Sequence, residues 1–113
     1  MIAGVGIDIL KISRIKVELA PKILSEEEFK IFNEIKLEKR RLEYLAGRFS
    51  VKEAIIKAIG STKYKITMKE ITVLNDELGR PFVKSPTYND IKLFISLSHE
   101  IDNCVGLCII ENV

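Results

Sequence analysis

The sequence predicts an α+β fold in which one long helix packs on an antiparallel sheet. Residues 41–60 carry apolar side chains at helical three- and four-residue spacing. Short runs rich in β-branched residues stand at 2–10 and again at 70–110. A strand, then helices, then a β-meander is an order typical of α+β proteins. Without a linker or repeat, the 113 residues are expected to form one domain, residues 1–113.

The chain is expected to open with a strand, and two helical segments follow it. Ile2–Leu10 alternates as a strand does, with Gly4 and Gly6 on the same side as Asp8. Residues 13–20 fit a short helix ended by Pro21.

A capping box and a glycine delimit the two longer helices. Ser25 with Glu28 forms the box and opens a helix that runs to about Ile35. The long helix begins near Glu38, and Gly60 is predicted to end it as a C′ glycine.

The second half is predicted to be a meander. Residues 70–74 and 82–83 form a hairpin around the turn residues Asn75–Pro81. Residues 91–97 and 104–110 are two further strands.

Glu53 is the most informative residue because it interrupts the apolar side of the long helix. The apolar residues of that side are Leu42, Leu45, Ala46, Phe49 and Ile56. At roughly 100° per residue, Glu53 falls within about 20° of the centre of this stripe. A carboxylate placed there has to be paired, protonated or bound to a cation, because burial of a lone charge is prohibitively costly.

Asp8 is a second carboxylate on an apolar surface. It interrupts the first strand beside Gly4 and Gly6, which would let a ligand or another backbone approach. One interpretation is that Asp8 only caps the following turn. The other is that Asp8 and Glu53 converge on one hard cation, for which Mg²⁺ is best suited because it needs few protein carboxylates.

Lys57 lies one turn after Glu53 and shares its face. It forms either an ordinary helix-surface pair with Glu53 or a cation held over a phosphate that the metal also binds. The single histidine, His99, is either a structural hydrogen-bonding residue or part of the site. Ser98 beside it points to the opposite face of a strand, so no Ser-His-Asp triad is expected.

Composition excludes several classes of protein. A net charge of +2 is too small to indicate a nucleic-acid-binding protein, and no apolar run is long enough to span a membrane. The N-terminus lacks a basic leader, so no signal peptide is expected. Cys104 and Cys108 are interpreted as buried free thiols of a cytoplasmic protein.

Four segments, in order, resemble the small bacterial 4′-phosphopantetheinyl transferases that make holo-acyl carrier protein. They are GVGIDI (4–9), LAGRFSVKEAIIKAIG (45–60), NDELGRPFV (75–83) and SLSHE (96–100). The resemblance implies the fold of these transferases and transfer of phosphopantetheine from coenzyme A to a serine of apo acyl carrier protein, with release of adenosine 3′,5′-bisphosphate. It also implies homotrimers with active sites between subunits.

The resemblance also implies roles for particular residues. Asp8 and Glu53 would hold Mg²⁺, Lys57 would offset charge on the phosphoryl group, and Glu53, directly or through a metal-bound water, would take the serine proton. The expected coenzyme A contacts are Arg48, Lys52, Pro81 and His99. Arg14 matches a position that meets the acidic carrier protein.

The chain departs from the usual family pattern at four places, one of which is Glu100, where Asp or Thr commonly follows the histidine. Ser50 and Val51 change packing near the site, Ser61-Thr62 replaces a Thr-Gly pair, and lysines stand at 16 and 22 where arginines are common. Two alternatives remain open, a metal-dependent nucleotide pyrophosphohydrolase and a carrier-protein-binding module without catalysis.

Overall fold

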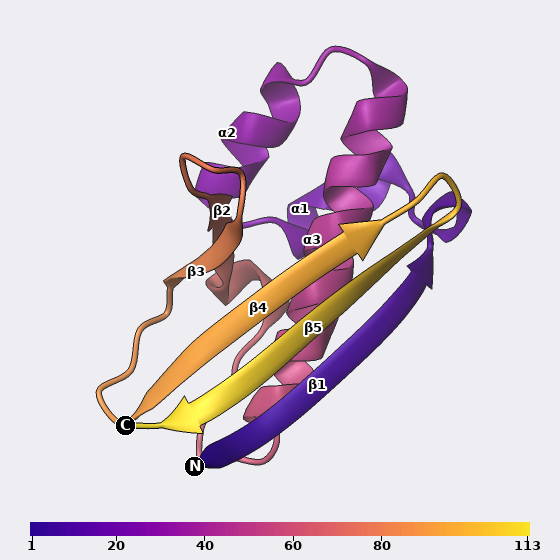
Figure 1. The fold of residues 1–113 in the computed structure, drawn as a ribbon. Helices are drawn as coiled ribbons and strands as arrows, with labels where there is room; N and C mark the ends of the chain where they lie inside the picture. The colour runs from indigo at the N-terminus through magenta and orange to yellow at the C-terminus, as the bar shows by residue number, and fades with distance from the viewer.

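A three-stranded antiparallel sheet packs against one long helix in the computed structural model, which describes residues 1–113 (Figure 1). The strands are β1 (Ile2–Lys11), β5 (Asn103–Asn112) and β4 (Ile91–His99), in the order β1-β5-β4. The helix is α3 (Glu38–Ile59), which crosses behind the sheet. The predicted α+β fold is therefore confirmed.

Glycines on the inner face of the sheet let α3 approach closely. A Cβ on Gly6 would lie 2.0 Å from the Ala54 carbonyl oxygen, and one on Gly106 would lie 2.6 Å from Val51 Cα. Gly6 and Asp8 face the same side of β1, as the alternation predicts. The space beside Asp8 is thus closed by the backbone of this same chain.

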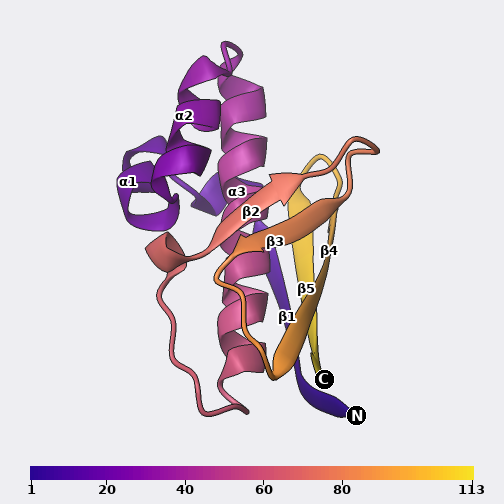
Figure 2. The ribbon, with the colours of Figure 1, turned by 90° about the vertical axis from the view of Figure 1, so that its left-hand side faces the viewer.

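The other side of α3 is covered by short helices and a separate hairpin (Figure 2). The helices are α1 (Ala20–Ile23) and α2 (Glu26–Glu34), and the hairpin consists of β2 (Thr72–Asn75) and β3 (Pro81–Ser85). Three single 3₁₀ turns complete the chain at Ile12–Arg14, Val17–Leu19 and Met68–Glu70. Helix α3 contributes to both clusters of buried apolar side chains, so it lies at the centre of the molecule.

Several local predictions are confirmed. Ser25 and Glu28 form the capping box of α2 through reciprocal hydrogen bonds. The hairpin turns at Gly79, whose φ of 83° is the left-handed value that glycine adopts readily. Both cysteines are free and buried. No helix has the length and apolarity that a membrane span requires.

Two predicted helix ends are wrong. Residues 13–20 do not form one helix ended by Pro21, because Pro21 lies in the first turn of α1, where its missing N–H is not needed. Gly60 follows α3 but has φ −57° and ψ −20°, which continues the right-handed helical conformation. Its N–H donates to the Ile56 carbonyl, so the helix ends without a left-handed cap.

Candidate active site

Asp8 and Lys57 join β1 to α3. The ammonium of Lys57 donates to the Ile7 carbonyl at 3.0 Å and lies 3.4 Å from Asp8 Oδ1. The Asp8 side chain is 16% exposed, whereas that of Lys57 is 54% exposed. Asp8 caps no turn, since the following 3₁₀ turn has no side-chain cap. Its carboxylate is therefore paired with Lys57 alone and stands on an edge strand of the sheet, where a further cation or ligand can reach it.

Glu53 lies on the side of α3 that carries two residues in contact with β1. Ser50 Oγ donates to the Asp8 carbonyl at 3.1 Å, and Lys57 contacts residues 7 and 8. Glu53 lies three residues after Ser50 and four before Lys57, so it occupies the helix face between these two contacts. We call Asp8, Glu53 and Lys57 the carboxylate cluster.

The prediction that Glu53 lies at the centre of the buried stripe is wrong. Glu53 is half-buried, as are Phe49 and Ile56, whereas Val51 and Ile55 are fully buried. Because the sheet covers one side of α3 and the hairpin and short helices cover another, the helix has more than one buried side, and a single stripe cannot describe it. Glu53 lies at the border of the core, where solvent and ligands can reach it.

The donor set of the carboxylate cluster fits a hard divalent cation. It consists of two carboxylates, and no group of three or more His, Cys, Asp or Glu side chains is arranged for a metal anywhere in the chain. That composition is unlike a closed zinc site, which needs four protein ligands. It suits Mg²⁺, which is held by one or two carboxylates and by the phosphates of a substrate.

A cavity of about 440 Å³ opens on the hairpin side of α3. It brings together Arg48, Pro81 and His99, which the sequence placed in three separate motifs. We call it the hairpin cavity; its remaining lining residues are Ile35, Arg40, Glu43, Tyr44, Gly47, Asn75, Gly79 and Leu97. Leu97 passes close to Gly47, where an added Cβ would lie 3.0 Å from Leu97 Cδ2.

Arg48 is fixed in the wall of the hairpin cavity. The residue is 6% exposed, and its Nη2 donates to Asn75 Oδ1 at 2.5 Å. Its guanidinium lies 4.6 Å from the centre of the Tyr44 ring. Arg40 and Arg48 outnumber the one carboxylate of the lining, Glu43, so the cavity favours an anionic ligand. Asn75 opens the motif at 75–83 but had no predicted role of its own, and Tyr44 was not among the predicted site residues, although it lies four residues before Arg48.

Lys52 does not line the cavity, contrary to its expected role in binding coenzyme A. Its side chain is fully buried, and its ammonium bonds to Glu28 Oε1 at 2.5 Å and to the carbonyls of Ile23 and Met68. All three ammonium protons are therefore used in the interior. Desolvation lowers the pKa of Lys52, while the Glu28 carboxylate opposes that shift.

The carboxylate cluster and the hairpin cavity lie on opposite sides of α3. Arg48 contacts Asn75 of the hairpin, whereas Lys57 contacts β1 at the far edge of the sheet. Lys57 follows Arg48 by nine positions, which corresponds to about 900° of rotation, so the two side chains leave the helix about half a turn apart. Within one chain, the structure does not bring Asp8 and Glu53 together with Arg48 and His99.

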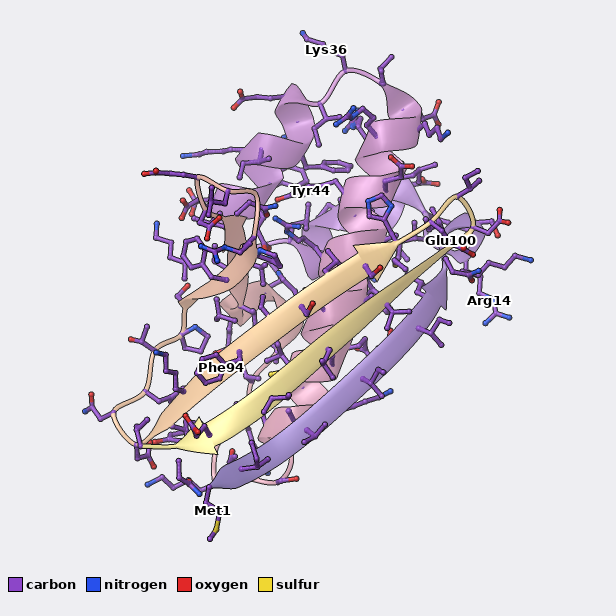
Figure 3. All side chains as sticks on the ribbon, viewed as in Figure 1. Met1, Arg14, Lys36, Tyr44, Phe94 and Glu100 are labelled. Atoms are coloured by element: carbon purple, nitrogen blue, oxygen red, sulfur yellow. The ribbon has the colours of Figure 1, made fainter.

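Arg14 lies at the end of β1, beside the turn between β4 and β5 (Figure 3). The Ile12 N–H donates to the Asp102 carbonyl of that turn and joins the two segments. Arg14 itself is exposed and points away from the molecule, as Figure 3 shows.

Comparisons with known proteins identify the family of this chain. The family model of the 4′-phosphopantetheinyl transferase superfamily matches residues 4–108. The holo-[acyl-carrier-protein] synthase of Clostridium tetani is 38% identical over 125 residues, covering 98% of this chain and 97% of its own. The crystal structure of the Bacillus anthracis synthase in complex with coenzyme A (3′,5′-ADP) has a TM-score of 0.87 and 34% identity, covering 100% of this chain and 99% of its own.

Proposed function

The chain belongs to the 4′-phosphopantetheinyl transferase superfamily, and we propose that its carboxylate cluster and its hairpin cavity are two halves of one active site. The function is that of a holo-[acyl-carrier-protein] synthase, which transfers 4′-phosphopantetheine from coenzyme A to apo acyl carrier protein. Relatives that match over nearly their full length support this activity for the whole chain.

The reaction is a phosphoryl transfer. A serine oxygen of the carrier protein forms a bond to the phosphorus that bears the pantetheine arm. The bond from that phosphorus to the bridging oxygen breaks, and adenosine 3′,5′-bisphosphate leaves with the electron pair. In such reactions most of the catalysis comes from positioning and from neutralising charge.

The carboxylate cluster supplies the catalytic groups in this proposal. Asp8 and Glu53 would hold Mg²⁺, which would neutralise charge on the pyrophosphate of coenzyme A when bound. Glu53 accepts the serine proton, because its helix position leaves it half-buried and accessible. Lys57, already held against β1 by Ile7 and Asp8, offsets negative charge on the leaving oxygen. The observation that carries this assignment is the Lys57–Asp8 contact, which joins the first motif to the long-helix motif.

The hairpin cavity would bind the nucleotide end of coenzyme A. Arg48 supplies positive charge for its phosphates, His99 offers a ring nitrogen for hydrogen bonding, and Pro81 forms part of the wall beside them. The rigid hold of Asn75 on Arg48 orients the guanidinium before the substrate arrives.

A homotrimer with sites between subunits would unite the two halves. The outer face of the sheet is apolar and uncovered: Val5 is 57%, Ile7 59%, Ile9 70% and Phe94 45% exposed. An apolar patch of this kind is characteristic of a protein interface. Association of three copies through this face would let the carboxylate cluster of one subunit meet the hairpin cavity of its neighbour.

Other residues bear on the protein partner and on the cellular compartment. Exposed Arg14 would contact the acidic carrier protein near the carboxylate cluster. Two free cysteines and the use of coenzyme A support a reducing cytoplasm. Because both clusters of buried apolar side chains include residues of α3, we infer that residues 1–113 act as one domain.

The function is tested by incubating the protein with coenzyme A, Mg²⁺ and apo acyl carrier protein, and by following the mass of the carrier protein. A phosphopantetheine adduct and stoichiometric release of adenosine 3′,5′-bisphosphate are expected. Hydrolysis of coenzyme A without an adduct would instead identify a pyrophosphohydrolase. Binding of the carrier protein with neither product would identify a non-catalytic module.

A further inference from the structure

Two buried polar atoms in the wall of the hairpin cavity have no hydrogen-bond partner. They are the hydroxyl oxygen of Tyr44 and the Nε of Arg48. The two residues are four apart on α3, and the guanidinium lies against the tyrosine ring. Figure 3 shows Tyr44 between α3 and α2, on the side of the helix that the hairpin covers. Buried polar groups are nearly always paired, so two orphans in one wall point to a missing partner.

The missing partner has to be a hydrogen-bond acceptor. Arg48 Nε can only donate. Burial raises the pKa of Tyr44, although the positive charge of Arg48 opposes this shift, so the hydroxyl keeps its proton at neutral pH and can donate as well. The nearest candidate within the protein, Asn75 Oδ1, already accepts from Arg48 Nη2, and Asn75 Nδ2 donates to the Gly79 carbonyl.

The same wall separates the hairpin cavity from a second cavity. Tyr44, Arg48 and Asn75 also line a space of about 390 Å³ against Glu27, Ile31 and Leu74. Glu27 is paired with Lys84 at 2.7 Å, so it is not available to the two donors. Glu43, the carboxylate of the hairpin cavity, accepts no hydrogen bond from either donor. This leaves a ligand that enters one of these cavities as the source of the acceptor.

We propose that the Tyr44 hydroxyl is a further binding group of the synthase, and that with Arg48 Nε it donates hydrogen bonds to the 3′-phosphate of coenzyme A. The inference rests on the proposed function, which places the nucleotide in the hairpin cavity. A phosphate is an anion whose oxygens accept several hydrogen bonds, and the Arg48 cation stands against the same ring. An adenine nitrogen could accept one of these hydrogen bonds, but it carries no negative charge to pair with the Arg48 guanidinium.

The test compares coenzyme A with 3′-dephospho-coenzyme A in Tyr44→Phe, which removes only the hydroxyl. A hydrogen bond to a charged group is worth about tenfold or more in affinity. The expected result is an increase of about tenfold in KM for coenzyme A at similar kcat. The ratio of kcat/KM for coenzyme A to that for 3′-dephospho-coenzyme A should fall by the same factor.

Tyr64→Phe is the matched control. The Tyr64 hydroxyl donates to Asp90 Oδ1 at 2.5 Å, outside the hairpin cavity. Its removal should lower the free energy of unfolding and leave the ratio between the two substrates as in the wild type. Tyr44→Phe should leave the free energy of unfolding equal or higher, because an unpaired buried hydroxyl destabilises the folded protein.

The outcomes separate this inference from the proposed function. Transfer by the wild type with an unchanged substrate ratio in Tyr44→Phe would overturn the role of Tyr44 alone. An equal loss for both substrates would also overturn it, because the hydroxyl would then contact another part of the molecule. Absence of transfer by the wild type would overturn the proposed function itself.

Discussion

At the scale of single residues, the carboxylate cluster combines like charges with one cation. Asp8 lies on β1, Glu53 lies on α3 between Ser50 and Lys57, which contact β1, and Lys57 is paired with Asp8. Two carboxylates that share a site repel each other unless a cation lies between them. The cluster is therefore arranged for ligand binding at some expense of stability, as functional sites commonly are.

We predict that Glu53→Gln abolishes transfer without unfolding the protein. Loss of a catalytic proton acceptor costs about 100-fold or more in kcat. Without divalent cations, the free energy of unfolding should be equal to or higher than that of the wild type, because a like charge near Asp8 is gone. Phosphopantetheine transfer and urea denaturation measure the two effects. Normal turnover by this variant would contradict the assignment of Glu53 as the proton acceptor. Glu34→Gln, at an exposed position on α2, serves as the control.

Some candidate site residues can be selected from the sequence because they differ in polarity from the residues around them. Asp8 interrupts an apolar strand and Glu53 an apolar helix face, so each could be selected from its surroundings. Lys52 could not be assigned correctly, because its partner Glu28 lies 24 residues away and already had a local explanation as a capping residue. A local sequence pattern does not show which residues, far apart in the sequence, contact each other in the core.

At the scale of elements, the buried pair of Glu28 and Lys52 connects α2 to α3 and adds hydrogen bonds to the segments around them. Glu28 accepts hydrogen bonds from the N–H groups of Ser25 and Val73 as well as from Lys52. Lys52 in turn bonds to the carbonyls of Ile23 and Met68. The end of α1, the start of α2 and strand β2 are thus held against α3 at the residue next to Glu53.

Glu28→Gln should destabilise the fold by about 3–5 kcal/mol, because it leaves the Lys52 ammonium buried without a counter-charge. The neighbouring Glu27→Gln is the control. It breaks only the partly exposed pair with Lys84, and such pairs contribute less than about 1 kcal/mol. Urea denaturation at pH 7 compares the two variants. Equal losses would show that the buried pair contributes no more than the surface pair.

Strand β5 gives the protein an alkaline dependence of stability. Burial raises the pKa of Cys108 from 9.0 to about 12. Between these values the unfolded chain loses the thiol proton and the folded chain keeps it, so the free energy of unfolding falls as pH rises. Lys52, whose pKa is lowered, contributes the opposite slope below its ordinary value of 10.5.

The difference between wild type and Cys108→Ala isolates the contribution of the thiol. The wild type should lose stability more steeply than the variant between pH 9 and about pH 12, the range that the raised pKa of Cys108 defines. Denaturation curves measured across this range provide the comparison. If the free energy of unfolding depends on pH in the same way for both proteins, the raised pKa of Cys108 is contradicted.

At the scale of the whole molecule, the sequence predicted the helices and strands but not how they are arranged around α3. The motifs at residues 4–9, 45–60, 75–83 and 96–100 are all present in the fold, yet the helix carries Arg48 and Lys57 on opposite sides. A motif that spans several helical turns necessarily presents residues to different neighbours. The sequence of β1 is also that of an ordinary strand. It does not show that the outer face of the sheet stays uncovered, because exposure depends on how the other elements pack.

Mixing two inactive variants tests whether the active site forms between subunits. Glu53→Gln damages the carboxylate cluster, and Arg48→Met damages the hairpin cavity while keeping an apolar stem against Tyr44. If each site takes one half from each of two neighbouring subunits, trimers that contain both variants include sites with two intact halves. Random assembly at equal amounts should restore about one quarter of wild-type activity.

This restoration requires subunit exchange, so the two chains are co-expressed or refolded together. Each variant assembled alone is expected to be nearly inactive, which supplies the baseline. A site contained within one chain would give no recovery at any mixing ratio, because every chain then carries one damaged half. Replacing Ile7 and Ile9, which are 59% and 70% exposed, with glutamate should prevent assembly and abolish the recovery as well. Sedimentation equilibrium on the same samples would show whether recovered activity follows the trimer.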